Sequence, residues 1–383
     1  MAPTSSHIGI LLAIIFTICI FDLVFVWRTL ENELEPQQQQ KQEEQQYYSS
    51  ENTAQLHQPN INSTTSITDV PPEKQRAYQI LLSAGVAEPI PAELIAKLPA
   101  WSDIVSQYGS EPIIANLESC PKFRAAIPKR ERFAAVAGMF NTGTNLLANL
   151  ITKNCQIDGH KTGTGMRIQV PWGKHNPPVT HRLRNVAKIA GKGINQTTVF
   201  PLVIIKDPYH WATSQCRHKY FTNWEHDAEH CPNIVNYRHT RRTKRGEPTK
   251  VLVKYALERV EYETLLGQWN GWYEDYEDQT NVYPLAILRF EDMLFHANEV
   301  INQLCSCVGG RRRNHGHLLY PMDSAKPDEG THAGSNGLTE ALIRYGDPKK
   351  RMEGWTREDW NYARDHLERG LMERYGYSWP DPP

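Results

Sequence analysis

The chain has 383 residues, a formal net charge of -1 and 22% charged residues. This length suffices for one large domain with appended segments. A net charge so close to zero gives no global positive field, so we expect no nucleic-acid partner.

The first part of the chain changes composition twice. Residues 1–7 form a short tail, and residues 8–27 are almost entirely apolar. A helix of that length spans about 30 Å, the thickness of the hydrocarbon core of a bilayer. No small-x-small cleavage site follows, which favours an uncleaved signal anchor over a signal peptide. Arg28 follows the segment and no Lys or Arg precedes it, which by the positive-inside rule argues against a cytoplasmic N-terminus.

Residues 28–72 are rich in Gln, Glu, Ser, Thr and Asn, so they cannot bury a core and we expect a disordered stem. Glycosylation sequons begin at Asn62 and Asn195. These acceptors favour a lumenal position for everything after the anchor, which is the type II orientation.

Six cysteines follow the anchor, and an even count permits disulfides in an oxidising compartment. Metal binding is the alternative, but Cys305-x-Cys307 alone makes a poor zinc site. Buried free thiols are a third possibility. The sequence leaves the pairing open, although Cys216 and Cys231 flank part of a polar segment that they could staple.

Residues 73–131 contain short amphipathic runs, which predict two or three short helices leading into a domain at 132–383. Phe133 to Ala137 is a continuous apolar run, typical of a buried strand. The apolar residues of 146–151 recur at helical spacing, so a helix follows. A tight loop from a strand into a helix N-terminus points several backbone N–H groups at one spot, which favours phosphate binding.

This loop, Gly138 to Asn145, almost matches the Walker A pattern G-x-x-x-x-G-K-[ST]. Thr144 stands where that pattern has its lysine, and Asn145 stands where it has the metal-binding hydroxyl. The sequence therefore predicts a phosphate cradle that does not hold a metal–nucleoside triphosphate. The alternative is a strand–turn–helix corner without a ligand.

A second buried strand, Val199 to Lys206, leads through Pro208 into a helix that carries Ser214. A lysine at the carboxyl end of a strand and a serine one to two turns into the next helix can converge on one anion. The alternative is a charged strand end followed by an exposed helix serine.

Together these elements resemble the sulfotransferase family that uses 3′-phosphoadenosine 5′-phosphosulfate (PAPS). That family has Arg-Asp-Pro at a strand end and a serine eight residues after the arginine; here Lys206-Asp-Pro and Ser214 keep the spacing. The loop 141–147, Asn-Thr-Gly-Thr-Asn-Leu-Leu, is similar to the family's Lys-Ser-Gly-Thr-x-x-Leu. Residues 285–292 are similar to its strand ending in Tyr-Glu-Asp. The resemblance covers roughly residues 132–379.

The resemblance implies an α/β fold of the P-loop-NTPase-like, three-layer type, and PAPS as the donor of a metal-independent in-line sulfuryl transfer. It implies donor contacts from these residues: Asn141, Thr142, Gly143, Thr144, Asn145, Lys206 and Ser214. A basic segment with Lys350 and Arg351 would close the site of the 3′-phosphate. One departure is Asn141, where the family carries Lys or Arg to stabilise the leaving group.

The resemblance also guides the choice of a general base. Lys174-His175-Asn-Pro lies between the two phosphate elements and is similar, with a different spacing, to the Lys-x-His-x-Pro of soluble members. We therefore expect His175 to take the acceptor's proton, as histidine does near neutral pH, and Lys174 to stabilise the leaving group. His160 and an unidentified glutamate are the alternative bases, and Lys161 is the alternative cation. Another alternative is that His175 and Lys174 lie in a solvent-exposed loop without a role.

The rest of the chain predicts further elements. We expect an inserted polar and basic loop at 222–250, a strand at 282–290, and helices at 251–276, 300–308, 338–345 and 356–375. A near capping box, Thr356 with Asp359, starts the last of these helices.

Taken together, the sequence predicts a single-pass Golgi membrane protein that transfers a sulfuryl group to a hydroxyl or amine of a glycan in the lumen. Three alternatives remain at this point: a P-loop nucleotide kinase, a Golgi glycosyltransferase, and a non-catalytic, membrane-tethered nucleotide- or glycan-binding module. The absence of an Asp-x-Asp motif argues against the glycosyltransferase.

Overall fold

The computed structural model describes residues 70–86, 88–184, 194–239, 244–321 and 337–383. All of them belong to one compact unit, Ile61–Pro383. The predicted anchor, most of the predicted stem and Asn62 lie outside the described residues. Within these residues, no helix has the length and apolar character needed to cross a bilayer.

The centre of the molecule is a five-stranded sheet in the order β1-β9-β5-β2-β4. Its strands are β1 (Ile114–Ala115), β2 (Phe133–Gly138), β4 (Met166–Arg167), β5 (Val199–Ile205) and β9 (Ala286–Arg289). β4, β2, β5 and β9 run parallel, and only β1 pairs antiparallel. Parallel strands need crossover connections, which are usually helices, so both faces of such a sheet become covered.

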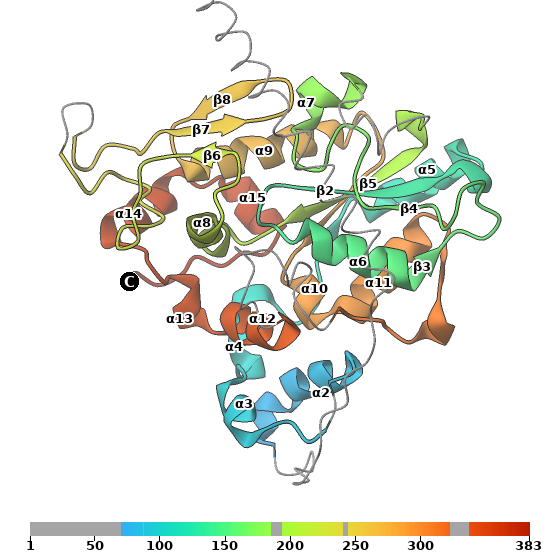
Figure 1. The fold of residues 1–383 in the computed structure, drawn as a ribbon, viewed down its shortest axis with the longest axis horizontal. Coiled ribbons are helices and arrows are strands. Elements are labelled where there is room, and N and C mark those ends of the chain that lie inside the picture. The colour runs from blue at the N-terminus through green and yellow to red at the C-terminus, as the bar shows by residue number, and fades with distance from the viewer. Residues whose placement is uncertain (1–69, 87, 185–193, 240–243, 322–336) are drawn as a thin grey trace, which may run out of the picture. The chain divides into compact units, whose positions relative to one another are not determined.

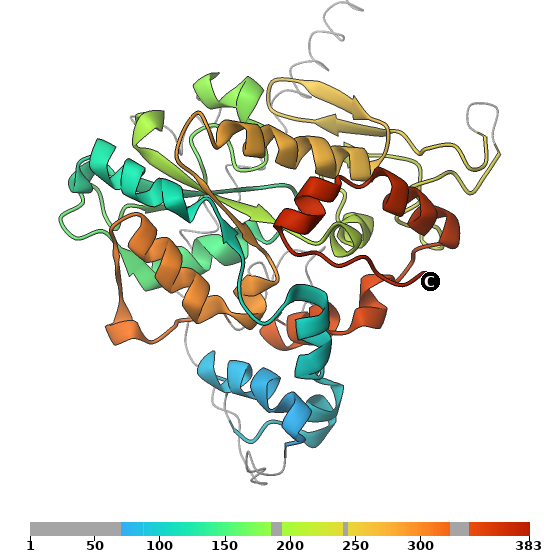
Figure 2. The same cartoon turned by 180° about the vertical axis from the view of Figure 1, so that it is seen from behind.

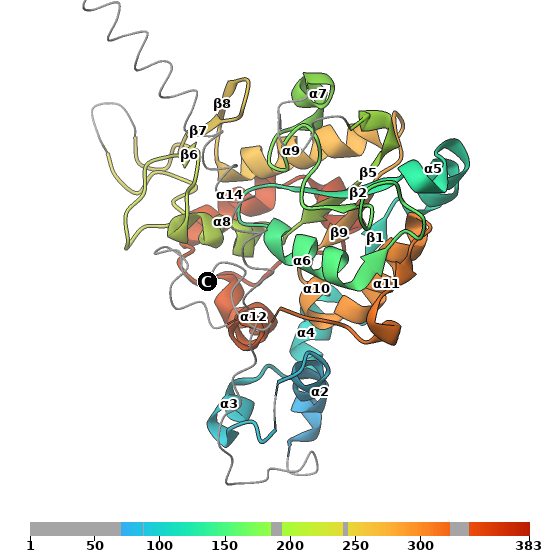
Figure 3. The ribbon, with the colours of Figure 1, turned by 45° about the vertical axis from the view of Figure 1, so that its right-hand side comes forward.

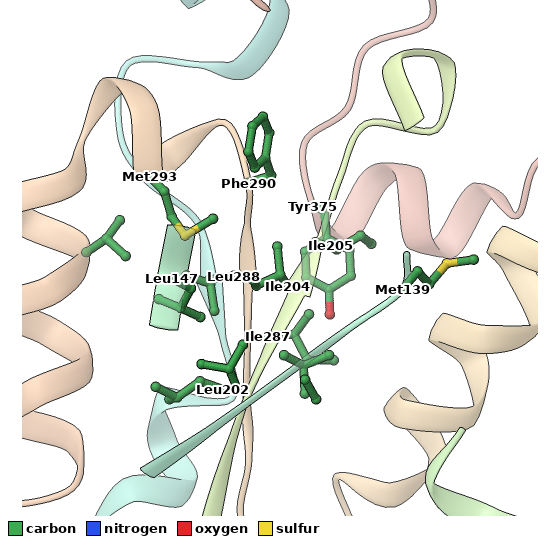
Figure 4. Packing of buried hydrophobic residues seen from close by; sticks show 14 of the residues in the cluster. Met139, Leu147, Leu202, Ile204, Ile205, Ile287, Leu288, Phe290, Met293 and Tyr375 are labelled. Atoms are coloured by element: carbon green, nitrogen blue, oxygen red, sulfur yellow. The ribbon is translucent and has the colours of Figure 1, made fainter. Parts of the chain in front are cut away.

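Figure 3 shows this layering, with α6 (Thr144–Asn154) and α11 (Ala297–Cys307) on one side of the sheet and α9 (Leu265–Gln279) on the other. The expected mixed α/β class with a mostly parallel sheet is confirmed. Every residue of β2 and β5 is buried, which explains why these strands have continuous rather than alternating apolar sequences. In Figure 4, Leu202 and Ile204 of β5 lie on the same face of the sheet as Leu288 of β9 and Leu147 of α6.

The order of the strands brings the segments that follow β2 and β5 to the same edge of the sheet. The chain runs from β2 through α6 to β4 on one side, and then returns to β5 on the other side of β2. Ligands of open α/β sheets bind at such a reversal, outside the carboxyl ends of the strands. Gly138 pairs with Ile204, so the ends of β2 and β5 lie level. The loop after Gly138 and the residue Lys206 therefore meet at this edge.

The predicted lead-in, residues 73–131, holds four short α-helices where two or three were expected, and its strand β1 belongs to the central sheet (Figures 1 and 2). Its helices are α2 (Gln75–Ser83), α3 (Ala92–Lys97), α4 (Trp101–Tyr108) and α5 (Cys120–Ala126). Further short helices are α7 (Pro178–His181), α8 (Pro208–Arg217), α10 (Asp292–Phe295), α12 (Gly337–Gly346) and α13 (Pro348–Arg351). The expected strand at 282–290 and the helices at 300–308 and 338–345 are confirmed as β9, α11 and α12.

Two expectations about local structure are wrong. Residues 251–262 are not helical: β7 (Val251–Lys254) and β8 (Arg259–Tyr262) pair antiparallel, and with β6 (Thr222–Asn223) they form a second sheet. Val251 and Val253 are buried while Leu252 is exposed, which is the two-residue period of a strand.

The second wrong expectation is a single last helix. It is two helices, α14 (Arg357–His366) and α15 (Arg369–Arg374), because the backbone is extended at Leu367 and Glu368 caps the second helix. The capping box of Thr356 and Asp359 is confirmed.

All six cysteines that follow the predicted anchor are paired. The expected staple Cys216–Cys231 is present, and Cys120–Cys307 and Cys155–Cys305 complete the set. The last two tie α5 and β3 (Cys155–Gln156) to α11, and β3 also pairs with β10 (Arg311–Arg312).

Candidate functional site

The loop between β2 and α6 leaves several of its backbone N–H groups without a hydrogen-bond acceptor among the described residues. In the described part of the chain, the N–H groups of Gly143 to Leu146 make no backbone hydrogen bond. The loop carbonyls do have partners: Met139 accepts from the Thr142 hydroxyl at 2.7 Å and Phe140 from the Trp211 indole at 2.8 Å. Consecutive N–H groups without an acceptor, at the positive N-terminal end of a helix, form a concave site that binds anions.

Both glycines of the loop are required by its packing. A Cβ on Gly138 would lie 2.6 Å from the Thr142 hydroxyl oxygen. Gly143 has φ +83°, and a Cβ there would lie 2.5 Å from the Phe290 ring. The glycine spacing seen in the sequence therefore reflects close approach at two separate points.

Lys206 follows β5 directly and is 2% exposed. Its ammonium donates to the Ser214 hydroxyl at 2.9 Å, the Tyr345 hydroxyl at 2.7 Å and the Asn141 carbonyl at 3.2 Å. Burial lowers the pKa of Lys206, and interaction with Tyr345 opposes that effect.

All three acceptors of Lys206 are neutral. No carboxylate of the described residues lies within ion-pair distance of its ammonium. A buried charge without a counter-ion is costly, and an anionic ligand at this point would remove that cost.

The residue after Lys206 has a structural role. The Asp207 carboxylate accepts from the amides of Tyr209 and His210, so it caps α8. Arg351 lies 2.6 Å from the same carboxylate and donates to Ser378. Arg351 therefore reaches the strand end through Asp207.

Lys350, the other residue expected to close the phosphate site, is exposed and pairs with Glu353 at 3.5 Å. Its contact with a phosphate stays a prediction, as does that of Arg351.

Lys174 brings a cation to the loop from another part of the chain. It is 6% exposed, and its ammonium donates to the Asn145 side chain, in the first turn of α6, at 2.8 Å. Its carbonyl accepts from the amide of Gly138 at 2.8 Å. Asn141, in contrast, has φ +64° and donates its side-chain amide to the His218 carbonyl at 2.6 Å. A buried cation, Lys174, thus contacts the first turn of α6, whereas Asn141 brings no charge to the loop.

His175 lies at the same edge of the sheet. Its Nδ1 is 2.7 Å from the carbonyl of Gly138, which can only accept, so Nδ1 carries a proton and the neutral ring has its lone pair on Nε2. The ring packs on Phe140 at a centroid distance of 4.3 Å. A fixed tautomer and a fixed ring are what a general base requires.

The two alternative residues lie elsewhere. The ring of His160 packs on Phe133, the first residue of β2, at 4.6 Å, and the amide of Lys161 donates to Arg130. Both therefore lie near the amino end of β2, which is the opposite edge of the sheet from the loop.

Residues 285–292 contact the strand end that carries Lys206 and Asp207. Arg289 and Asp292 form a buried, bidentate ion pair with both distances 2.7 Å. Glu291 is fully buried and accepts from the Asp207 amide and the Tyr377 hydroxyl, each at 3.1 Å. Burial, together with the charge of Asp207, raises the pKa of Glu291 to about 7.

The sequence reasoning missed Tyr345, because nothing in its local pattern sets it apart from other aromatic residues of a helix. Arg217 was also missed, although it stands one turn beyond Ser214 and its guanidinium lies 3.3 Å from the Ser214 hydroxyl. Helical spacing from Ser214 was the one signal that could have identified it.

Asn195 is exposed, as a glycan acceptor must be, and its side-chain oxygen accepts from Thr197. The described residues contain no group of three or more His, Cys, Asp or Glu side chains that could hold a metal ion. Comparisons with protein-family models, curated proteins and solved structures found no match.

Proposed function

We propose that this protein is a PAPS-dependent sulfotransferase of the P-loop-like type, with its donor site at the β2–β5 edge of the sheet. The observation that carries this proposal is the position of Lys206. Its ammonium bonds at once to Ser214, eight residues later, and to the carbonyl of Asn141 in the loop. The two motifs expected to hold opposite ends of the donor thus share one buried cation.

In this proposal the loop amides of Gly143 to Leu146 hold the 5′-phosphosulfate, and Lys206 with Ser214 holds the 3′-phosphate. His175 takes the proton of the acceptor hydroxyl or amine on Nε2 as the acceptor atom attacks sulfur. A bond from sulfur to the acceptor forms, and the bond from sulfur to the bridging oxygen of the donor breaks. The electron pair of that bond leaves with the 3′,5′-bisphosphate, where Lys174 stabilises the developing charge.

We propose a glycan as the acceptor and the lumen of the Golgi as the location, with the chain anchored as a single-pass type II protein. The three disulfides and the exposed sequon at Asn195 support an oxidising, glycosylating compartment. The apolar segment at 8–27 supports the anchor. The acceptor class rests on these features and on the family resemblance alone.

The test is calorimetric binding of 3′-phosphoadenosine 5′-phosphate (PAP) to the full-length chain in detergent and EDTA. We compare wild type with the double variant Lys206→Ala/Ser214→Ala. A second variant, Lys206→Arg, restores the residue that the family carries and guards against a loss of fold. Lys122→Ala/Ser102→Ala, which changes an exposed lysine and an exposed serine, is the matched control.

Metal-independent binding that is lost in the alanine pair and kept in the arginine variant and the control supports the proposal. Binding of ATP only with Mg²⁺ would replace it with the nucleotide kinase. PAP binding without transfer to any of a panel of glycans and phenols would favour the non-catalytic module. The neutral Asn141 is the feature consistent with that last outcome.

A further inference from the structure

Tyr345, in the last turn of α12, lies inside the candidate donor site although it is far from the motifs in sequence. Its side chain is 7% exposed, and its hydroxyl oxygen is 2.7 Å from the Lys206 ammonium. Its ring packs edge-to-face with the rings of Phe290 and His210, each at a centroid distance of 4.8 Å. Tyr345 thus contacts the cation that joins the two phosphate motifs.

The hydroxyls of Tyr345 and Ser214 both accept a hydrogen bond from Lys206. The Ser214 hydroxyl donates its proton to the His210 carbonyl at 2.7 Å. The Tyr345 hydroxyl accepts from Lys206 and also hydrogen-bonds with the Ser214 side chain. The acceptors of Lys206 among the described residues are all neutral, so an anion that binds this ammonium would come within reach of the Tyr345 hydroxyl proton.

The charges around Tyr345 make its hydroxyl a stronger donor. Burial by itself would raise the pKa of Tyr345, but the positive charges of Lys206 and Arg217 outweigh that effect and lower the pKa below its ordinary value. A more acidic phenol forms stronger hydrogen bonds to anions.

The end of α12 is fixed in place by the lead-in helices. The Tyr108 hydroxyl donates to the Tyr345 carbonyl at 2.9 Å, and the Gln107 side chain donates to the Gly346 carbonyl at 3.0 Å. The backbones approach so closely that a Cβ on Gly346 would lie 2.4 Å from Pro99. The phenol is therefore held in position before any ligand binds, which limits the entropy lost on binding.

We infer that Tyr345 donates a hydrogen bond to the 3′-phosphate of the bound nucleotide and selects 3′-phosphorylated nucleotides over those with a free 3′-hydroxyl. This inference rests on the proposed function and assigns a role to a residue outside the family motifs. It also assigns a role to α4 of the lead-in, because α4 positions Tyr345 for its contact with the 3′-phosphate.

The test is Tyr345→Phe, which keeps the ring packing and removes only the hydroxyl. Affinities for PAP and for AMP, which lacks the 3′-phosphate, are measured by calorimetry on the full-length chain. We expect PAP to bind roughly 10- to 100-fold more weakly, as for a lost hydrogen bond to a charged group, and AMP to bind within about twofold of wild type. Tyr78→Phe is the matched control, because it removes a buried phenol that bonds to Glu88 in the lead-in; it should change neither affinity.

An equal loss for PAP and AMP would show a structural role for Tyr345 and overturn the inference, as would no loss at all. The proposed function fails separately, if wild type itself binds PAP no more tightly than AMP. A wild-type preference for PAP that Tyr345→Phe retains would overturn the inference and leave the donor proposal intact.

Discussion

Replacing Glu291 with Gln should change how the stability of the protein depends on pH. Glu291 is fully buried below the Lys206-Asp207 strand end, and its pKa is raised from the ordinary 4.5 to about 7. The unfolded chain therefore loses the proton of this residue before the folded chain does. The stability that Glu291 provides is fully present below pH 4.5 and is lost as pH rises through about 7.

The magnitude follows from the shift. Each unit of pKa difference corresponds to about 1.4 kcal/mol, so a shift from 4.5 to about 7 amounts to roughly 3 kcal/mol. Glutamine has nearly the same shape and stays neutral at every pH. Its side-chain oxygen can accept from the Asp207 amide, as Glu291 does. Between pH 4 and pH 8, Glu291→Gln should therefore gain about 3 kcal/mol of stability relative to wild type.

The assay is urea unfolding of the disulfide-intact protein, followed by tryptophan fluorescence at several pH values from 4 to 8. The quantity of interest is the difference in unfolding free energy between variant and wild type, because other titrating groups cancel in it. Glu353→Gln is the matched control, since Glu353 is exposed and its pairing with Lys350 is a surface contact. A difference that stays flat across this range would refute the argument that burial keeps Glu291 protonated.

Two further predictions concern the loop and the chemistry. Gly143→Ala should lower stability by about 1–3 kcal/mol and weaken PAP binding, because the residue has φ +83° and the new Cβ meets Phe290. Gly159→Ala, at φ +73° with open space around it, separates backbone strain from this clash in the same unfolding and calorimetry measurements. His175→Ala should lower kcat by about 10²- to 10⁴-fold with PAP affinity unchanged, and Lys174→Met should lower kcat by about 10²- to 10³-fold. Transfer of ³⁵S-labelled sulfate from PAPS measures both, and an unchanged kcat in either variant would remove that residue from the mechanism.

The central strands and the loop between them were predictable because their signals are local. A strand buried on both faces must be apolar throughout, and this pattern appears directly in 133–138 and 199–205. The hairpin at 251–262 was not predictable, because its few alternating residues adjoin the aromatic stripe of α9 and share its apolar character. Whether this segment follows the two-residue period of a strand or the 3.6-residue period of a helix depends on its pairing with β6. A long stretch of sequence separates β6 from β7.

The candidate site likewise combines features that the local sequence predicts with contacts that only the folded chain creates. The sequence by itself determined the glycine spacing of the loop and the spacing of Lys206 and Ser214, because each pair lies within a single strand–turn–helix segment. Only the tertiary structure placed the Lys174 ammonium against Asn145 in the first turn of α6 and the Tyr345 hydroxyl against Lys206. Strand order and the packing of α12 on the lead-in bring those residues together. Such contacts between distant segments depend on the whole folded core, and no local pattern of residue types encodes them.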